Sequence, residues 1–169
     1  NINTYGGAGG MSLSASYYGI GLPPIIENVL IHNNTANAGA AVQVLSSPES
    51  FSFILKNVTI TDNTSIHNNA GSIQCNSCDL NLVNSIVWGN SGNEIVINYA
   101  NQPGNISVSF SDIEGGESGI LTNDNGTVSW GNGNINADPL FVDVANADYN
   151  LQQGSPCIDS GDPSSPFDP

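Results

Sequence analysis

The chain has 169 residues, of which 38% are hydrophobic and only 9% are charged, and its formal net charge is −14 because 15 acidic residues face a single cation, Lys56. This length suffices for one domain with a packed core. The shortage of cations excludes nucleic-acid binding through phosphates and disfavours an anionic membrane surface. No apolar run approaches the length of a transmembrane helix, so we expect no membrane insertion by this chain.

The near absence of Lys and Arg would be unusual in a cytosolic protein. We therefore expect an exported protein, secreted or held at a cell surface. The sequence opens at Asn1 without an apolar leader, which favours a mature form or an internal piece of a longer protein.

A seven-residue pattern bounded by asparagines recurs along the chain. The three clear copies are 28–34, 57–63 and 84–90, which start 29 and 27 residues apart (28 to 57, 57 to 84), and 111–117 is a fainter fourth copy. A fixed period of this size is typical of a solenoid, in which each repeat forms one turn.

Each copy has the alternation of a short strand, whose successive side chains point to opposite faces. The inward face is predicted to carry small or β-branched residues: Val29/Ile31, Val58/Ile60 and Ser85/Val87. The outward face is predicted to carry Leu30/His32, Thr59/Thr61 and Ile86/Trp88.

Two further strands are expected in each repeat. One follows a small-residue corner, at 39–44, 71–75, 92–97 and 119–121, and the other precedes the Asn-bounded copy, at 51–55, 80–82 and 106–110. About three short strands per coil with no helix between them indicate an all-β chain of stacked triangular coils, paired in parallel. We place these coils in residues 1–133.

Asparagines open and close each copy, at Asn28, Asn57 and Asn84 and at Asn34, Asn63 and Asn90. Asn tolerates the left-handed backbone of a sharp corner, and identical side chains stacked coil on coil can form hydrogen-bonded ladders. The alternative is that Asn is simply common in turns. In the same register, Glu27 should face Lys56 across one coil step, which predicts an ion pair.

Three cysteines are present. The spacing of Cys75 and Cys78 suits a local disulfide in an exported protein better than a zinc site, because no second such pair exists. Cys75 is predicted to point inward, in register with Val44 and Ile97. Cys157 is left over.

The last part of the chain changes character. Residues 138–143 read DPLFVD, and residues 148–163 read DYNLQQGSPCIDSGDP. This block resembles the closing segment of secreted bacterial right-handed parallel β-helix proteins, and the upstream repeats resemble the same family more loosely. The resemblance implies a right-handed parallel β-helix in which residues 134–169 are the closing segment of the same domain. Family members usually continue into a further strand and an anchor, and we expect that this ending was trimmed or is not part of the folded unit.

The residues favour no catalysis by this chain, although the fold also hosts enzymes. A polyuronate lyase of this fold would need a Lys or Arg base and further basic residues that bind the substrate carboxylates. Lys56 is the only Lys or Arg in this sequence. A hydrolase of the polygalacturonase kind would need clustered carboxylates, and no Asp-Asp pair occurs. A fragment of a polysaccharide lyase or epimerase therefore remains the alternative.

Two candidate binding sites follow from the register. The outward file of His32, Thr61 and Trp88 would form a flat platform for a glycan, unless a loop covers it. Asp159 and Asp162 are the densest acidic group of the tail and are candidates for calcium, which prefers several oxygen ligands. No complete calcium-loop motif is present, so the sequence favours solvated acids over a calcium site. No other cofactor is expected.

We predict a structural or adhesive β-helix without chemistry of its own. Its first coil looks open and a last strand is missing, so strand edges at both ends should pair with other copies, head to tail, into filaments. A carbohydrate-binding module is the third alternative.

Overall fold

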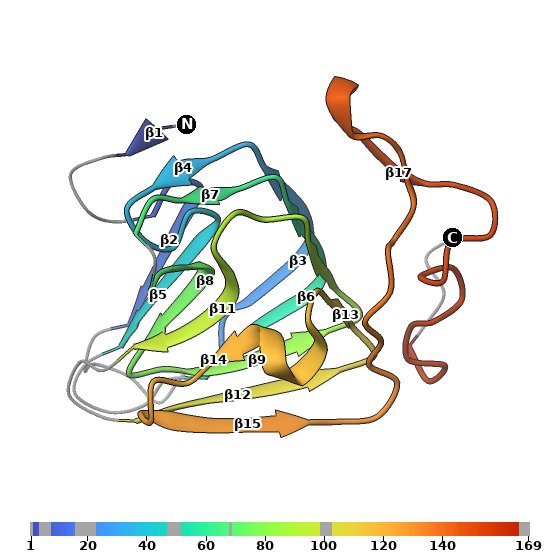
Figure 1. Ribbon diagram of the computed structural model, residues 1–169. Coiled ribbons are helices and arrows are strands. Elements are labelled where there is room, and N and C mark those ends of the chain that lie inside the picture. Colours follow the sequence, from blue (N-terminus) through green and yellow to red (C-terminus); the bar gives the residue numbers. More distant parts are fainter. Residues whose placement is uncertain are drawn as a thin grey trace.

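The computed structural model describes residues 2–3, 8–15, 23–46, 52–67, 69–98 and 103–165. Within these ranges the chain is nearly all β, with two 3-10 turns, η1 (Gly116–Gly119) and η2 (Val144–Asn146). The strands stack as parallel turns around one core, so the predicted parallel β-solenoid is confirmed (Figure 1).

Most strands belong to two large parallel sheets. One sheet has the order β14-β11-β8-β5-β2, and the other joins β13, β10, β6, β9, β12 and β15, with β3 on β6. The strand bounds are β1 Ile2–Asn3, β2 Met11–Ala15, β3 Ile25–His32, β4 Thr35–Ala36, β5 Val42–Ser46, β6 Ser52–Thr61, β7 Thr64–Ser65, β8 Gly71–Asn76, β9 Asp79–Val83, β10 Ile86–Trp88, β11 Asn93–Asn98, β12 Gly104–Ser109, β13 Asp112–Ile113, β14 Ile120–Leu121, β15 Gly126–Trp130, β16 Phe141–Asp143 and β17 Asp148–Leu151.

The register of the sheets follows the sequence repeat. Val29 lies beside Val58, and Ile60 lies beside both Ile31 and Val87. The inward side chains of successive turns therefore form aliphatic stacks, which are almost fully buried in the middle turns. Burial of these stacks is the main stabilising term of a solenoid, because each turn covers the next.

The first corner is made by the corner asparagines Asn28, Asn57 and Asn84. Their φ angles are 58°, 52° and 51°, so each adopts the left-handed backbone that Asn tolerates best among larger residues. In β3 and β6 the chain bends at this residue without leaving the sheet. In β6 the predicted strands 51–55 and 57–63 therefore form one element. Phe110, with φ 50°, takes the same place in the next turn.

The second corner differs from the prediction. The positive φ angles fall on Asn33, Asp62 and Gly89, one residue before the asparagines that close each copy. The closing asparagines therefore do not make the corner themselves. A third small sheet lies beyond this corner and was not predicted; it consists of the short strands β1, β4 and β7.

The predicted ion pair is confirmed. Lys56 Nζ lies 2.8 Å from Glu27 Oε1, on neighbouring strands of one sheet.

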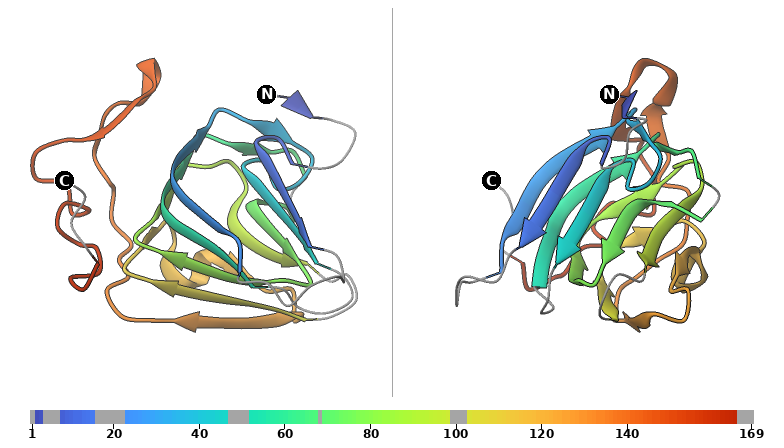
Figure 2. Two further views of the ribbon diagram at one scale, coloured as in Figure 1. Left: turned by 180° about the vertical axis from the view of Figure 1, so that it is seen from behind. Right: turned by 90° about the vertical axis from the view of Figure 1, so that its left-hand side faces the viewer.

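Parallel pairing extends slightly beyond the predicted boundary at residue 133, because Ile135 still forms a bridge to Asp112. Residues 136–165, here called the tail, then leave the last turn and run back along the side of the solenoid, beside β13, β6 and β3 (Figures 1 and 2). The tail contains the only antiparallel pair of the described part of the chain, β16 with β17.

Candidate functional site

The predicted outward file of His32, Thr61 and Trp88 exists as a register but not as an open platform. His32 lies beside Thr61 on the sheet, and Thr61 lies beside Trp88. Thr61 is only 2% exposed. Tyr149 of the tail packs on the His32 ring with 5.0 Å between ring centroids. The tail therefore covers part of this face and Thr61 is not available on it, so glycan binding by His32 and Trp88 stays a prediction.

Tyr149 is the central anchor of the tail. Its hydroxyl donates to Asp62 Oδ2 at 2.7 Å and accepts from the Asn33 amide at 3.2 Å. Phe141 packs edge-on against the Tyr149 ring, with 5.5 Å between centroids. Burial, aided by the Asp62 carboxylate, raises the pKa of Tyr149 to about 12, so the phenol stays protonated and keeps donating.

A second anchor joins Cys157 to the solenoid. The Cys157 thiol lies 3.0 Å from Asp112 Oδ2, and the backbone N–H of Ala137 donates to Asp112 Oδ1 at 3.1 Å. Burial raises the pKa of Asp112, and burial together with Asp112 raises the pKa of Cys157 to about 12. A thiol with so high a pKa is a poor nucleophile, so this pair is structural.

A third anchor uses Asn84, one of the corner asparagines. Its Oδ1 accepts from the backbone N–H of Asp162 at 2.9 Å, and its amide donates to Ser165 Oγ at 3.2 Å. Asn57 instead donates to Asn28 Oδ1 at 3.0 Å. The predicted corner ladder thus joins the first two asparagines, while the third turns to the tail.

The ladder predicted for the closing asparagines is present. Asn34 donates to Asn63 Oδ1, and Asn63 donates to Asn90 Oδ1, both at 3.0 Å. The same oxygens accept the backbone N–H groups of Asn34 and Asn63. Asn63 is completely buried. We call Asn34, Asn63 and Asn90 the inner ladder, since it satisfies polar groups that would otherwise be orphaned inside the corner.

The inner ladder ends on Glu94, which the sequence analysis did not single out. Asn90 donates to Glu94 Oε2 at 2.7 Å, and Glu94 is also hydrogen-bonded to Glu114. Burial is the largest of the causes that raise the pKa of Glu94 to about 8. The signal available in the sequence is an acid four residues after a ladder asparagine.

The predicted calcium residues are used in local turns. Asp162 Oδ1 accepts from both the backbone N–H and the hydroxyl of Ser164, and these bonds lower the pKa of Asp162. Asp159 occupies a left-handed turn position and is exposed. Across the ranges that the structure describes, no three His, Cys, Asp or Glu side chains gather as a metal site would require.

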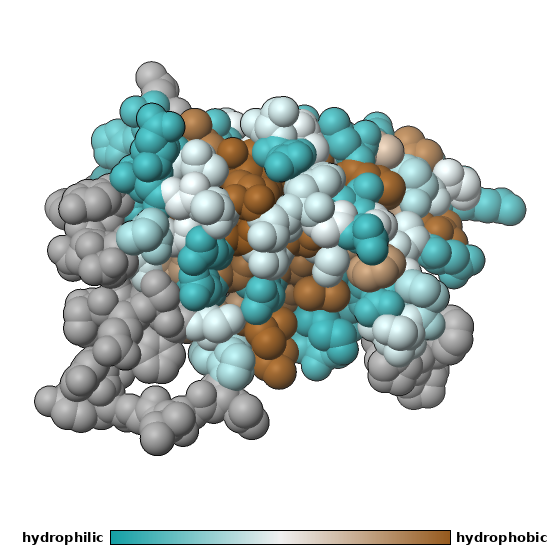
Figure 3. All heavy atoms as spheres, turned by 90° about the horizontal axis from the view of Figure 1, so that it is seen from below, coloured by the Kyte–Doolittle hydropathy of each residue, from teal (hydrophilic) through white to brown (hydrophobic). Residues whose placement is uncertain are grey.

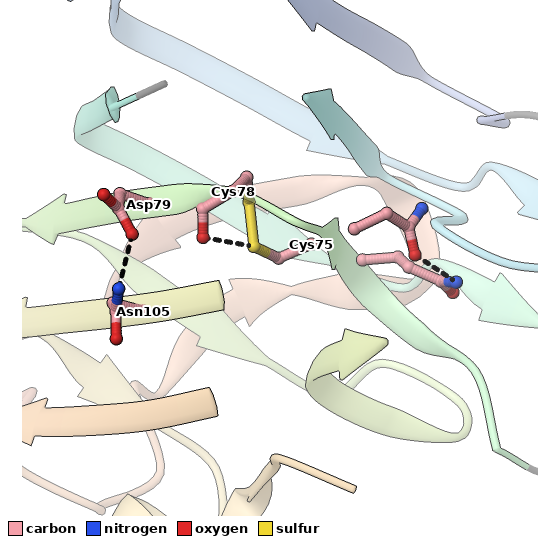
Figure 4. Close-up of a disulfide and its surroundings, with 6 residues drawn as sticks. Cys75, Cys78, Asp79 and Asn105 are labelled. Carbon is pink, nitrogen blue, oxygen red and sulfur yellow. Dashed lines mark hydrogen bonds between the residues drawn. A yellow bond between two sulfur atoms is a disulfide. The ribbon is translucent and has the colours of Figure 1, made fainter. Parts of the chain in front are cut away.

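Cys75 and Cys78 are joined by a disulfide where β8 turns into β9, with 5.6 Å between their Cα atoms (Figure 4). Both residues are fully buried. In the next turn Gly104 passes the bridge so closely that a Cβ there would lie 2.9 Å from the carbonyl oxygen of Cys78. The bridge therefore belongs to the core and offers no redox or metal site.

A cleft of about 500 Å³ lies between the second corner and η2 of the tail. Its solenoid wall carries polar groups that include Asn33, Asp62, Thr64 and Ser91, and its tail wall carries Val144, Ala145 and Ala147. No cationic side chain lines it. This arrangement suits a neutral, hydroxyl-bearing ligand better than an anion.

Comparison of the chain with models of known families, with curated proteins and with solved structures gave no match. In the described part of the chain, no helix has the length and apolar character needed to span a membrane.

Proposed function

We propose that this protein is a non-catalytic, extracellular structural or adhesive β-solenoid whose end strands pair with other copies, head to tail. The observation that carries the proposal is the state of the two ends. Within the described residues β2 and β3 at one end and β14 and β15 at the other pair on one side only, and the tail lies along the side instead of over either end.

The core residues of the end turns support this proposal. Ile26 and Val29 in β3 are only partly buried, whereas Leu55 and Val58, beside them in β6, are 0% and 1% exposed. Val128 and Trp130 at the other end, in β15, are likewise partly buried. The partly buried apolar residues that pack against the core are Met11, Leu13, Ile26, Val29, Val128 and Trp130. In the view toward β15, apolar side chains are visible between polar ones (Figure 3). Unpaired strand edges beside half-covered apolar groups favour pairing with another chain.

The resemblance of the tail to closing segments of secreted β-helix proteins, together with the net charge of −14, favours export. The contacts of three charged side chains argue against catalysis. Lys56 is held by Glu27, and the carboxylates of Asp62 and Asp112 hold the tail.

Negative-stain electron microscopy of the purified protein over a concentration series tests this proposal. We expect end-to-end rods or filaments. Ile25, 57% exposed on the outward side of the edge strand β3, would be covered in such a contact, so Ile25→Lys should abolish the filaments. Ile66→Lys is the matched control, because Ile66 is 48% exposed but lies at a corner. Single particles at every concentration, or filaments of Ile25→Lys, would contradict the proposal.

The cleft supports a second candidate, a carbohydrate-binding module that takes a neutral glycan between Asp62 and the tail. A glycan array tests it. Ala145→Trp would fill the cleft from the tail side and should abolish binding, whereas Val142→Trp, on an exposed position outside the lining, should not. No glycan bound by the unmodified protein, or equal binding by Ala145→Trp, would remove this candidate.

A further inference from the structure

The inner ladder ends in an unusual place for a charged residue. Glu94, in β11, is 5% exposed. Its Oε2 accepts from the Asn90 side-chain amide at 2.7 Å, and its Oε1 accepts from the Asn90 backbone N–H at 3.2 Å. An ionised carboxylate this deeply buried would need a cation or further donors, and the described contacts supply no cation.

The other contact of Glu94 is a second carboxyl group. Glu114, which follows β13, is hydrogen-bonded to Glu94, and Glu114 Oε2 accepts from the backbone N–H of Gly89 at 2.8 Å. Two carboxyl groups in contact cannot both ionise without strong repulsion, so one proton lies between them. Glu94 is the buried partner, so it keeps this proton and donates it toward Glu114.

The elements packed around Glu94 and Glu114 supply no positive charge that would stabilise an ionised Glu94. β11 packs against β8, β12, β14 and η1. Among these, β12 and β14 carry no titratable side chain, Cys75 in β8 is in the disulfide, and Glu117 in η1 is exposed. Asp112, in β13, feels the charge of Glu114, which helps to raise the pKa of Asp112. All of these charges are negative, so none of them would stabilise an ionised Glu94.

We propose that Glu94 and Glu114 form a proton-sharing latch that holds residues 114–119 against the preceding turn and loosens when the shared proton is lost. The latch joins Asn90 and Gly89 of one turn to the segment that opens the next. It does not depend on the proposed function, since it concerns cohesion within one chain.

The direction of the pH effect follows from linkage. The pKa of Glu94 rises from an ordinary value of 4.5 to about 8 in the folded protein. The folded state therefore keeps a proton that the unfolded state has released, so stability falls as pH rises from about 4.5 and levels off above about 8. Over that window the unfolding equilibrium constant should rise by up to about tenfold per pH unit.

Urea unfolding between pH 5 and pH 9 tests the latch. In Glu94→Gln, the amide N–H replaces the shared proton and the amide oxygen still accepts from Asn90. We expect this variant to lose most of the alkaline destabilisation and to be more stable than the unmodified protein at pH 9. Glu117→Gln is the matched control and should keep the pH dependence of the unmodified protein, because Glu117 is an exposed neighbour.

A second measurement needs no variant. Amide exchange by NMR should show that the protection factors of Gly89 and Asn90, which donate to the two carboxyls, fall across about pH 8. Met11, whose N–H donates to Ala41 in the first turns, should keep its protection. An unchanged pH dependence in Glu94→Gln, or constant protection of Gly89 and Asn90 across this range, would overturn the latch.

Discussion

The solenoid and the tail are held by different forces. The middle turns stack aliphatic side chains that are almost completely buried. The inner ladder provides hydrogen bonds for the buried polar groups at the second corner of these turns. Among the described residues of the tail only Pro139, Tyr149 and Ser155 are buried, and polar side chains make its anchors. The solenoid should therefore support itself, while the tail should open at a lower free energy.

The largest effect is expected inside the solenoid. Asn63→Ala would orphan the backbone N–H of Asn34 and the carbonyl groups of Ile31 and Thr61. Because these groups lie at a buried corner, we expect a loss of roughly 3–5 kcal/mol in the free energy of unfolding, measured by urea denaturation.

The matched control is Asn57→Gly, which keeps the left-handed corner and removes one exposed bond to Asn28. Its cost should stay below about 1 kcal/mol. Equal costs for the two substitutions would mean that the inner ladder has no special role.

The tail anchor comes next. Tyr149→Ala removes the ring from His32 and the hydroxyl from Asp62, so the free energy of opening the tail should fall by roughly 2–4 kcal/mol. Limited proteolysis within residues 136–165 should accelerate while the urea midpoint of the solenoid changes little. Tyr149→Phe, which keeps the ring, should show a smaller effect of about 1 kcal/mol. Loss of the solenoid in the same step would show that the two regions are one cooperative unit.

The disulfide should have a moderate effect. It closes a loop of only four residues, Cys75 to Cys78, so the chain-entropy relation predicts that reduction lowers the free energy of unfolding by about 2 kcal/mol. Urea denaturation with and without a phosphine reductant measures this difference. Cys157→Ser should show the same drop on reduction, and no drop in either protein would mean that the bridge does not stabilise the core.

The smallest effect is expected at the surface ion pair. Lys56→Met removes the ion pair with Glu27, in which the Lys56 and Glu27 side chains are 30% and 40% exposed. The loss in free energy of unfolding should therefore stay below about 1 kcal/mol and should vanish in high salt. A larger or salt-independent cost would indicate that the Lys56 side chain contributes through packing.

The periodic part of this fold could be predicted because each turn repeats the constraints of the last. The register of Val29 with Val58, the ion pair of Glu27 with Lys56 and the corner role of Asn28 all follow from the 27- to 29-residue spacing. The shift of the second corner from Asn34 to Asn33 could not be predicted, because the two residues are both Asn and tolerate positive φ equally well.

The candidate site was less predictable because the tail has no repeat. Nothing in the periodicity says that Tyr149 packs on His32, which lies more than a hundred residues earlier and is joined to it only by side-chain complementarity. The same holds for Cys157 with Asp112 and for Glu94 with Glu114. In each case the sequence shows the two side chains, and only the fold brings them together.

Hydrogen exchange measured by mass spectrometry at low and high protein concentration tests the proposed end-to-end pairing most directly. Peptides from β3 and β15, the strands at the two open ends, should gain protection as the concentration rises, while peptides from the tail and from the central strand β9 should not change. Protection of β3 and β15 that is independent of concentration, or that rises equally in the tail, would contradict the proposal that the ends of this solenoid are its contact surfaces.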